Sequence, residues 1–260
     1  MKCSLNSMNI GFRSSITDKE IDEFKNTKQH FSDCYLMTGL EALSHNENGR
    51  KILKKNIQHD DNNPYLINCY LYTPNGKQEK YSVPSNAVVK GYLNLYKEQK
   101  NDIIRSMDIS VGEYEKRYKA KPWICRVSDN FKKYTFENSL PSHFFKIFTG
   151  ITPTVNIAET DFNINLEAKK DEVMALFKRM SEEKDHSLLI STGVKVLDGR
   201  SWHVYLLEDV DLENHTVTVK EKHANKPKIM DIDTALKTFK FIVGYFNNDL
   251  APENIKLPRA

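Results

Sequence analysis

Apolar residues recur at helical intervals in several parts of the chain. After Cys34, the side chains of Leu36, Leu40 and Leu43 follow at spacings of four and three residues, which places them on one face of a helix. Stop signals at 46–49 should end that helix before a second one through residues 52–53. The same reasoning predicts further helices at residues 16–24, 87–105, 142–148, 167–183 and 233–239.

Segments typical of strands dominate the second half of the chain. β-branched and aromatic residues are concentrated at 187–192, 202–207, 216–222 and 241–246. Earlier, residues 65–72 and 79–83 flank the turn sequence Pro-Asn-Gly at 74–76, which predicts a β-hairpin. Because helices come first and strands later, without regular βαβ alternation, we predict an α+β fold.

The composition narrows the class of protein. The chain has 260 residues, of which 39% are hydrophobic, enough for one large core or two small ones. Its net charge of +3 is small and its charges are interleaved, so we expect no nucleic-acid partner. No apolar window is long enough to span a membrane, and the first residues lack the apolar core of a signal peptide.

Four cysteines, at positions 3, 34, 69 and 125, are widely spaced and form no Cys-x-x-Cys pair. This pattern argues against a disulfide framework and against a metal site, and it suits a reducing compartment. Cys34 differs from the others because it directly precedes a predicted helix and follows a polar stretch. The N-terminus of a helix favours thiolate over thiol, so Cys34 is our candidate nucleophile, whereas the other three are expected to be structural.

A thiol nucleophile needs a base within hydrogen-bond reach and a third group that orients the base. His203 begins a predicted strand after a turn, and residues 216–222 form the expected return strand. Side chains alternate along a strand, so Val217, Val219 and Glu221 share a face, and Glu221 at its end could lie beside His203. We therefore predict that His203 is the general base and that Glu221 orients it.

Together these pieces resemble the catalytic core of the calpain-type cysteine proteases, which have a papain-like fold. The stretch Gln29–Leu36 (QHFSDCYL) is similar to the family's motif Gln-Gly-x-x-Gly-Asp-Cys-Trp-Leu-Leu. The hairpin at 65–83, the segment LPSHFFKIFTGITPT at 140–154 and the histidine hairpin at 199–221 follow in the family's order. The resemblance extends from about residue 24 to residue 246.

The resemblance implies a nucleophile at Cys34, a general base and acid at His203, and an oxyanion donor at Gln29. Gln29 lies five residues before the cysteine, whereas the family's glutamine lies six before it. The family's Asn-Pro-Trp is absent, and the position of its asparagine falls at or near Glu221, with Asn225 and Asp209 as alternative orienting residues. No acidic loop supports the calcium sites that some calpain-type cores have, so no cofactor or metal is expected.

We accordingly expect a papain-like fold of two lobes at 16–250, flanked by tails at 1–15 and 251–260. The helical lobe, at about 16–150, would carry the cysteine, and the antiparallel β-rich lobe, at about 151–250, would carry the histidine. The expected activity is that of an endopeptidase on a protein or peptide substrate. Two alternatives stay open: transglutaminase- or deamidase-type acyl transfer on the same fold, and a non-catalytic binding module. A lone core of this size is typical of bacterial effector (virulence) proteases, which a specialised secretion system delivers into a host cytosol.

Overall fold

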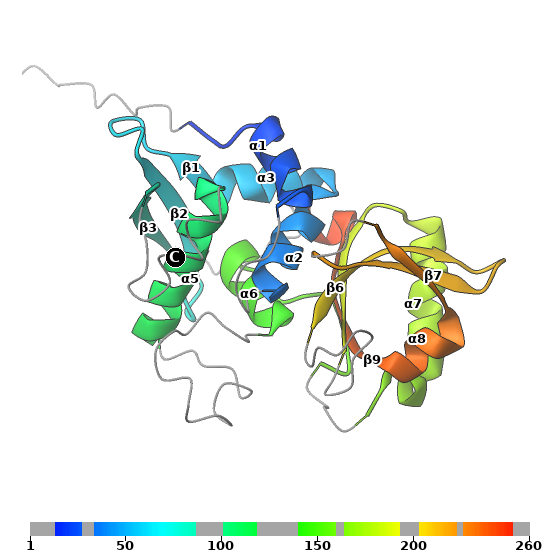
Figure 1. Ribbon diagram of the computed structural model, residues 1–260. Coiled ribbons are helices and arrows are strands. Elements are labelled where there is room, and N and C mark those ends of the chain that lie inside the picture. The colour runs from blue at the N-terminus through cyan, green and yellow to red at the C-terminus, as the bar shows by residue number, and fades with distance from the viewer. Residues whose placement is uncertain are drawn as a thin grey trace, which may run out of the picture.

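The computed structural model describes residues 14–27, 34–86, 101–118, 140–159, 164–192, 203–222 and 226–251. In the first half of the chain, helices pack against a small antiparallel sheet of order β1-β2-β3 (Figure 1). The elements are α1 (Asp18–Asp22), the 3-10 helix η1 (Glu23–Lys25), α2 (Cys34–Ser44), α3 (Glu47–Asn56), β1 (Ile57–His59), β2 (Leu66–Tyr72), β3 (Gln78–Pro84), α5 (Asp102–Tyr118) and α6 (Pro141–Thr149).

The second half of the chain contributes an antiparallel sheet of order β4-β9-β5-β6-β7-β8. Its elements are β4 (Val155–Ile157), η3 (Leu166–Lys169), α7 (Lys170–Glu182), β5 (His186–Thr192), β6 (Val204–Asp211), β7 (Thr216–Lys220), β8 (Lys228–Asp231), α8 (Ile232–Thr238), β9 (Phe239–Phe246) and η4 (Asn247–Leu250). The fold is therefore α+β, as the order of the elements predicted.

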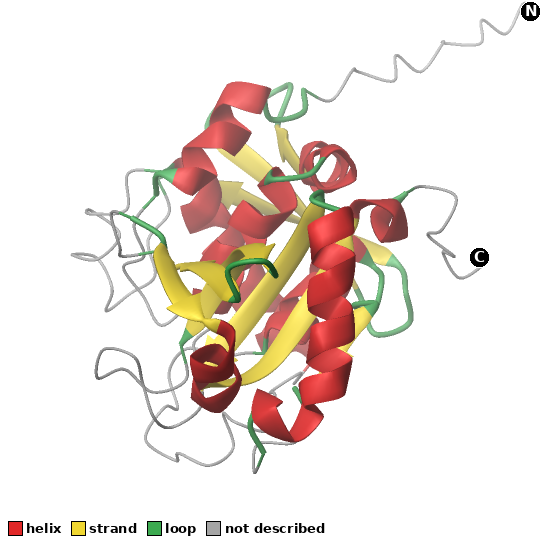
Figure 2. Ribbon diagram, turned by 90° about the vertical axis from the view of Figure 1, so that its right-hand side faces the viewer, coloured by secondary structure: helices red, strands yellow, loops and turns green. Residues whose placement is uncertain are grey.

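Both faces of the larger sheet are covered, as Figure 2 shows with helices in front of the strands and behind them. One face packs against α2 and α6 of the first half through alternate strand residues such as Leu189, Val204 and Leu206. The opposite face packs against α7 and α8 through Tyr205 and Leu207, among others. Strands β5 and β9 are buried on both sides along nearly their whole length. Because successive side chains of a strand point to opposite faces, the position of each residue decides which of the two cores its side chain joins.

Local sequence signals explain where several helices begin and end. The Thr17 hydroxyl and the Glu20 carboxylate form a reciprocal capping box at the start of α1. Gly150 ends α6 in the left-handed conformation, with φ of 79°, which glycine adopts without steric cost. Asp231 caps α8 by accepting a hydrogen bond from the backbone of Thr234 at 3.1 Å.

The structure corrects some predicted boundaries. Residues 46–49, which were predicted to end α2, also begin the next helix. The Asn46 side chain caps α3 by accepting a hydrogen bond from the Gly49 N–H at 2.6 Å. The helix predicted at 87–105 lies mostly outside the described residues, and α5 begins only at Asp102 and continues to Tyr118. Residue Phe239, predicted as the end of a helix, instead begins β9. The short strands β1, β4 and β8 were not predicted.

Candidate active site

Cys34 is the first residue of α2, at the end where the backbone N–H groups of a helix have no partner within the helix. Its sulfur is in no disulfide, and the residue is 8% exposed. Every residue of this helix is buried, because α2 lies between α6 and the larger sheet, where it contacts β5 and β6. The predicted nucleophile is thus fixed in a rigid, enclosed helix.

The contacts of α2 with the larger sheet show toward which end of the sheet the N-terminus of the helix points. The Ser187 hydroxyl, near the start of β5, donates to the carbonyl of Ala42 near the end of α2 at 2.8 Å. Strands β5 and β6 are antiparallel, so the start of β5 lies opposite the end of β6. The N-terminus of α2 lies about 12 Å along the helix axis from Ala42, at 1.5 Å per residue. Cys34 is therefore directed away from Ser187, toward the end of the sheet where β6 begins.

His203 lies at this end of the sheet, directly before β6. Its Nε2 atom is 3.4 Å from Oε1 of Glu221, which directly follows β7. Their side chains are 8% and 13% exposed, so little water screens the interaction. The proximity predicted from strand alternation is confirmed; the catalytic roles of both residues stay predictions.

The neighbours of His203 hold both its backbone and its ring. The His203 carbonyl accepts hydrogen bonds from the Thr192 N–H at 3.0 Å and the Ser191 hydroxyl at 2.9 Å. The ring meets the ring of Tyr205 edge to face, with 5.0 Å between centroids. These contacts restrict rotation of the imidazole, which is the property that an oriented base requires.

The face of the sheet on which each side chain lies limits how the Cys34 thiol can reach the His203 imidazole. Cys34 belongs to the core that includes Val204, on the face of the sheet that α2 covers. The ring of His203 packs on Tyr205, whose side chain belongs to the core on the opposite face. A thiol and an imidazole on these two residues must therefore meet around the end of the sheet, beyond the first residue of β6, rather than through it.

The other residues proposed for the site have different outcomes. Asp209 cannot orient His203, because it lies six residues farther along the strand and its carboxylate is paired with Lys184 at 2.6 Å. Strand rise of about 3.3 Å per residue puts some 20 Å between them. Gln29 and Asn225 lie outside the described residues. Of the three carboxylates or amides considered, Glu221 is the one that contacts His203 in the part of the chain that the structure describes.

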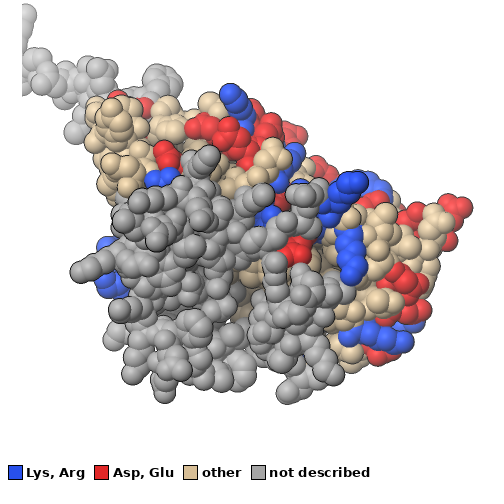
Figure 3. Space-filling model, in the orientation of Figure 1, with Lys and Arg blue, Asp and Glu red and all other residues tan. Residues whose placement is uncertain are grey.

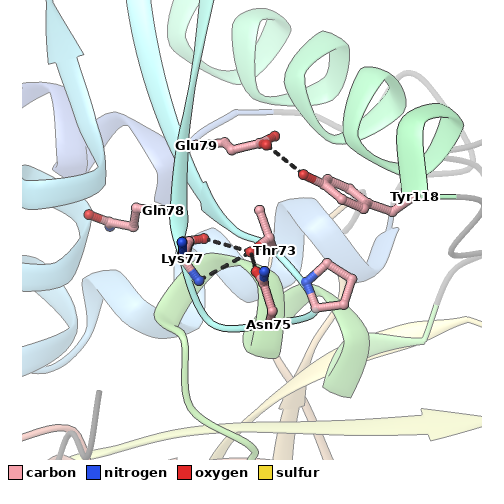
Figure 4. Close-up of a pocket in the computed structure, with 7 residues that line it drawn as sticks. Thr73, Asn75, Lys77, Gln78, Glu79 and Tyr118 are labelled. Carbon is pink, nitrogen blue, oxygen red and sulfur yellow. Dashed lines mark hydrogen bonds between the residues drawn. The ribbon is translucent and has the colours of Figure 1, made fainter. Parts of the chain in front are cut away.

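A hollow of about 390 Å³ lies elsewhere, at the tip of the β2–β3 hairpin (Figure 4). Thr73, Asn75 and Lys77 form its floor through turn hydrogen bonds, and Tyr118 closes one side by donating to Glu79 at 2.5 Å. None of its lining residues belongs to α2, β6 or β7. This hollow is therefore separate from the candidate active site.

Three further observations concern the described residues as a whole. Within the described ranges, no group of three His, Cys, Asp or Glu side chains is arranged to hold a metal ion. Among these same residues, no helix has both the length and the apolarity needed to cross a membrane. Positive and negative side chains are interspersed on the coloured part of the face in Figure 3. This mixing agrees with the near balance of charge in the sequence.

No protein-family model matches the chain, and no curated protein is significantly similar to it. The calpain-type family therefore stays a prediction. Sequence reasoning overlooked one further group beside the site: Glu41, a buried carboxylate on the same helix as Cys34. The available signal was its position seven residues after Cys34, about two helical turns, on the same face of a helix that is otherwise mostly apolar.

Proposed function

We propose that this protein is a papain-like, calpain-related cysteine endopeptidase that cleaves a protein substrate. The observation that carries the proposal is the 3.4 Å contact between His203 and Glu221 at the end of the sheet toward which the N-terminus of α2 is directed. A buried imidazole beside a largely buried carboxylate, at the end of the sheet toward which a cysteine at a helix N-terminus is directed, is the arrangement that nucleophilic thiol catalysis uses.

The contact with Glu221 supports different roles for the two ring nitrogens. Nε2 faces the carboxylate, so Nδ1 is the atom that exchanges a proton with Cys34. Glu221 stabilises the imidazolium that forms when the thiol gives up its proton. In this respect a carboxylate replaces the neutral asparagine of the calpain-type motif, and it should hold the thiolate–imidazolium pair more strongly.

Hydrolysis then proceeds in two steps. The Cys34 thiolate attacks the scissile carbonyl carbon, and the His203 imidazolium gives its proton to the departing amine, which leaves a thioester. Water next attacks the thioester while His203 takes a proton from it, which releases the carboxylic acid and restores the thiol. The backbone N–H of Cys34 and the side chain of Gln29 would stabilise the oxyanion, and loss of one such donor typically costs about 10²–10³ in turnover.

The test is covalent labelling with a peptidyl vinyl sulfone, a peptide-like electrophile for activated thiols, followed by mass spectrometry of the labelled peptide. Cys34 should react, and His203→Ala should slow its reaction by at least about 10²-fold, as removal of a general base does. Cys69 is the internal control, because its thiol is fully buried and burial raises its pKa to about 12. Equal labelling of Cys34 in the native protein and in His203→Ala would refute the proposal.

The products distinguish the proposed reaction from acyl transfer. Incubation with a mixed proteome should give new N-termini that depend on Cys34, as an endopeptidase requires. Conversion of glutamine to glutamate or to a crosslinked amide without new N-termini would indicate a deamidase or transglutaminase instead. We further propose that the enzyme works in a reducing cytosol, as a bacterial effector delivered into a host cell, because thiolate catalysis requires a reduced cysteine.

A further inference from the structure

A buried ion cluster joins the two halves of the chain next to the candidate active site. The Glu41 carboxylate of α2 receives Nζ of Lys220 at 2.8 Å on one oxygen and Nζ of Lys222 at 2.7 Å on the other. The side chains of Glu41 and Lys222 are 1% and 2% exposed. The Lys222 ammonium also donates to the carbonyl of Phe24 in η1. Charges this deeply buried are costly unless they are paired, and here each has its partners.

The two lysines are the residues on either side of Glu221. Side chains alternate on a strand, so Lys220 and Lys222 both face α2 while Glu221 faces the other way, toward His203. The Glu41 carboxylate, on the helix that carries Cys34, is therefore ion-paired with the residues directly before and after Glu221. Glu41 lies two turns from Cys34, about 10.5 Å along the axis of α2.

The two lysines differ in their position relative to strand β7. Lys220 is the last residue of β7 and its backbone is paired with Leu206 of β6. Lys222 lies two residues beyond the end of β7. The contacts of its side chain with Glu41 and with the Phe24 carbonyl bind this part of the chain to the helical half.

We propose that Glu41 and Lys222 are positioning residues for the reaction: their ion pair holds Glu221 against His203 at a fixed distance from the helix that carries Cys34. The inference rests on the proposed function, because it gives the pair a role in that site. It adds that the geometry of the base is set from the cysteine helix itself, so that the nucleophile and its base keep one relative placement.

The main experiment is a double-mutant cycle with Lys222→Met and Glu221→Gln, read from Cys34 labelling by the peptidyl vinyl sulfone. Lys222→Met should lower the maximal labelling rate by about 10²-fold, the cost of a misplacement of about 1 Å, while the half-saturating concentration stays nearly constant. In the Glu221→Gln background, Lys222→Met should cause almost no further loss, since Lys222 acts through Glu221. A purely structural role would give losses that multiply.

Two further variants separate positioning from loss of folding. Glu41→Leu combined with Lys222→Leu removes both buried charges, a change that often leaves stability intact, and it should show the same slow labelling with a normal unfolding transition. Lys220→Met is the matched control, because Lys220 touches the same carboxylate but is held by the sheet; its labelling rate should change less than about threefold.

A spectroscopic measurement tests the placement without any reaction. The ¹⁵N resonances of the His203 imidazole should move in Lys222→Met in the same direction as in Glu221→Gln. Unchanged resonances, or a labelling rate for folded Lys222→Met equal to that of the native protein, would overturn the inference. If His203→Ala leaves the labelling of Cys34 unchanged, the proposed function is refuted, and this inference, which depends on it, is refuted as well.

Discussion

Gly39 of α2 occupies a position where any side chain would collide with a closed aromatic cluster. A Cβ atom built there would lie 2.6 Å from both Cδ1 and Cε1 of Phe144 in α6. That ring cannot easily give way, because Phe144 is fully buried and stacks on Phe148 with 5.5 Å between centroids and 11° between planes. Tyr35 packs edge to face against it from α2. Gly39→Ala therefore forces α2 and α6 apart.

Two opposing effects decide the size of the change. Alanine in a helix interior is favoured over glycine by about 1 kcal/mol. Overpacking of a well-packed core costs about 1–3 kcal/mol, and a contact of 2.6 Å with two ring atoms at once should fall in the upper part of that range. We expect Gly39→Ala to lower the free energy of unfolding by about 1–2 kcal/mol and Tm by roughly 2–4 °C per kcal/mol.

Urea unfolding followed by fluorescence and scanning calorimetry measures this change. Phe144→Leu is the partner variant: it leaves space where the new methyl group would lie. The loss in the Gly39→Ala, Phe144→Leu double variant should be smaller than the sum of the two single losses, because the residues are in contact. A Gly39→Ala variant that is as stable as the native protein or more so, or two losses that simply add, would refute the packing argument.

Three further outcomes are expected. Burial lowers the pKa of His186 to about 4 from 6.5, so the unfolded state binds its proton first and native stability should fall as pH drops from about 6.5 to 4, by up to about 1.4 kcal/mol per unit; His186→Leu should flatten this slope in acid unfolding curves. Iodoacetamide should modify Cys34 in the native protein but Cys69 only after denaturation, as peptide mass mapping would reveal. Glu221→Gln should slow Cys34 labelling by at least about 10²-fold while Asp209→Asn leaves it unchanged, and the reverse order would exclude Glu221 as the orienting residue.

The predictions from sequence succeeded where one local rule dominated. The stripe after Cys34 and the Pro-Asn-Gly turn each depend on neighbours within a few residues, and both α2 and the β2–β3 hairpin formed as expected. The proximity of His203 to Glu221 was predictable for a similar reason, because strand alternation across a short hairpin leaves few arrangements. Gly150 likewise marked the end of α6.

Predictions were incomplete where distant contacts decided the outcome. The sequence around Asn46 shows a break, but not that the same residue begins α3 and also reaches Ser187 of β5. Strand β4 is short and, among the described strands, pairs only with β9, which comes from the last part of the chain. Glu41 would be assigned to solvent from its residue type alone, and its burial depends on lysines that follow it by 179 and 181 residues (220 − 41 and 222 − 41).

The position of α2 also has a consequence for the order of events during synthesis. This helix is made early, yet its apolar residues are buried against Leu189, Val204 and Leu206, which are made late. His203 follows Cys34 by 169 residues (203 − 34), an interval of about 8–34 s at roughly 5–20 residues per second. Throughout this interval the nascent chain has the thiol but lacks the His203 imidazole and strands β6 to β9 of the larger sheet. A partly made chain at the ribosome therefore cannot assemble the proposed site.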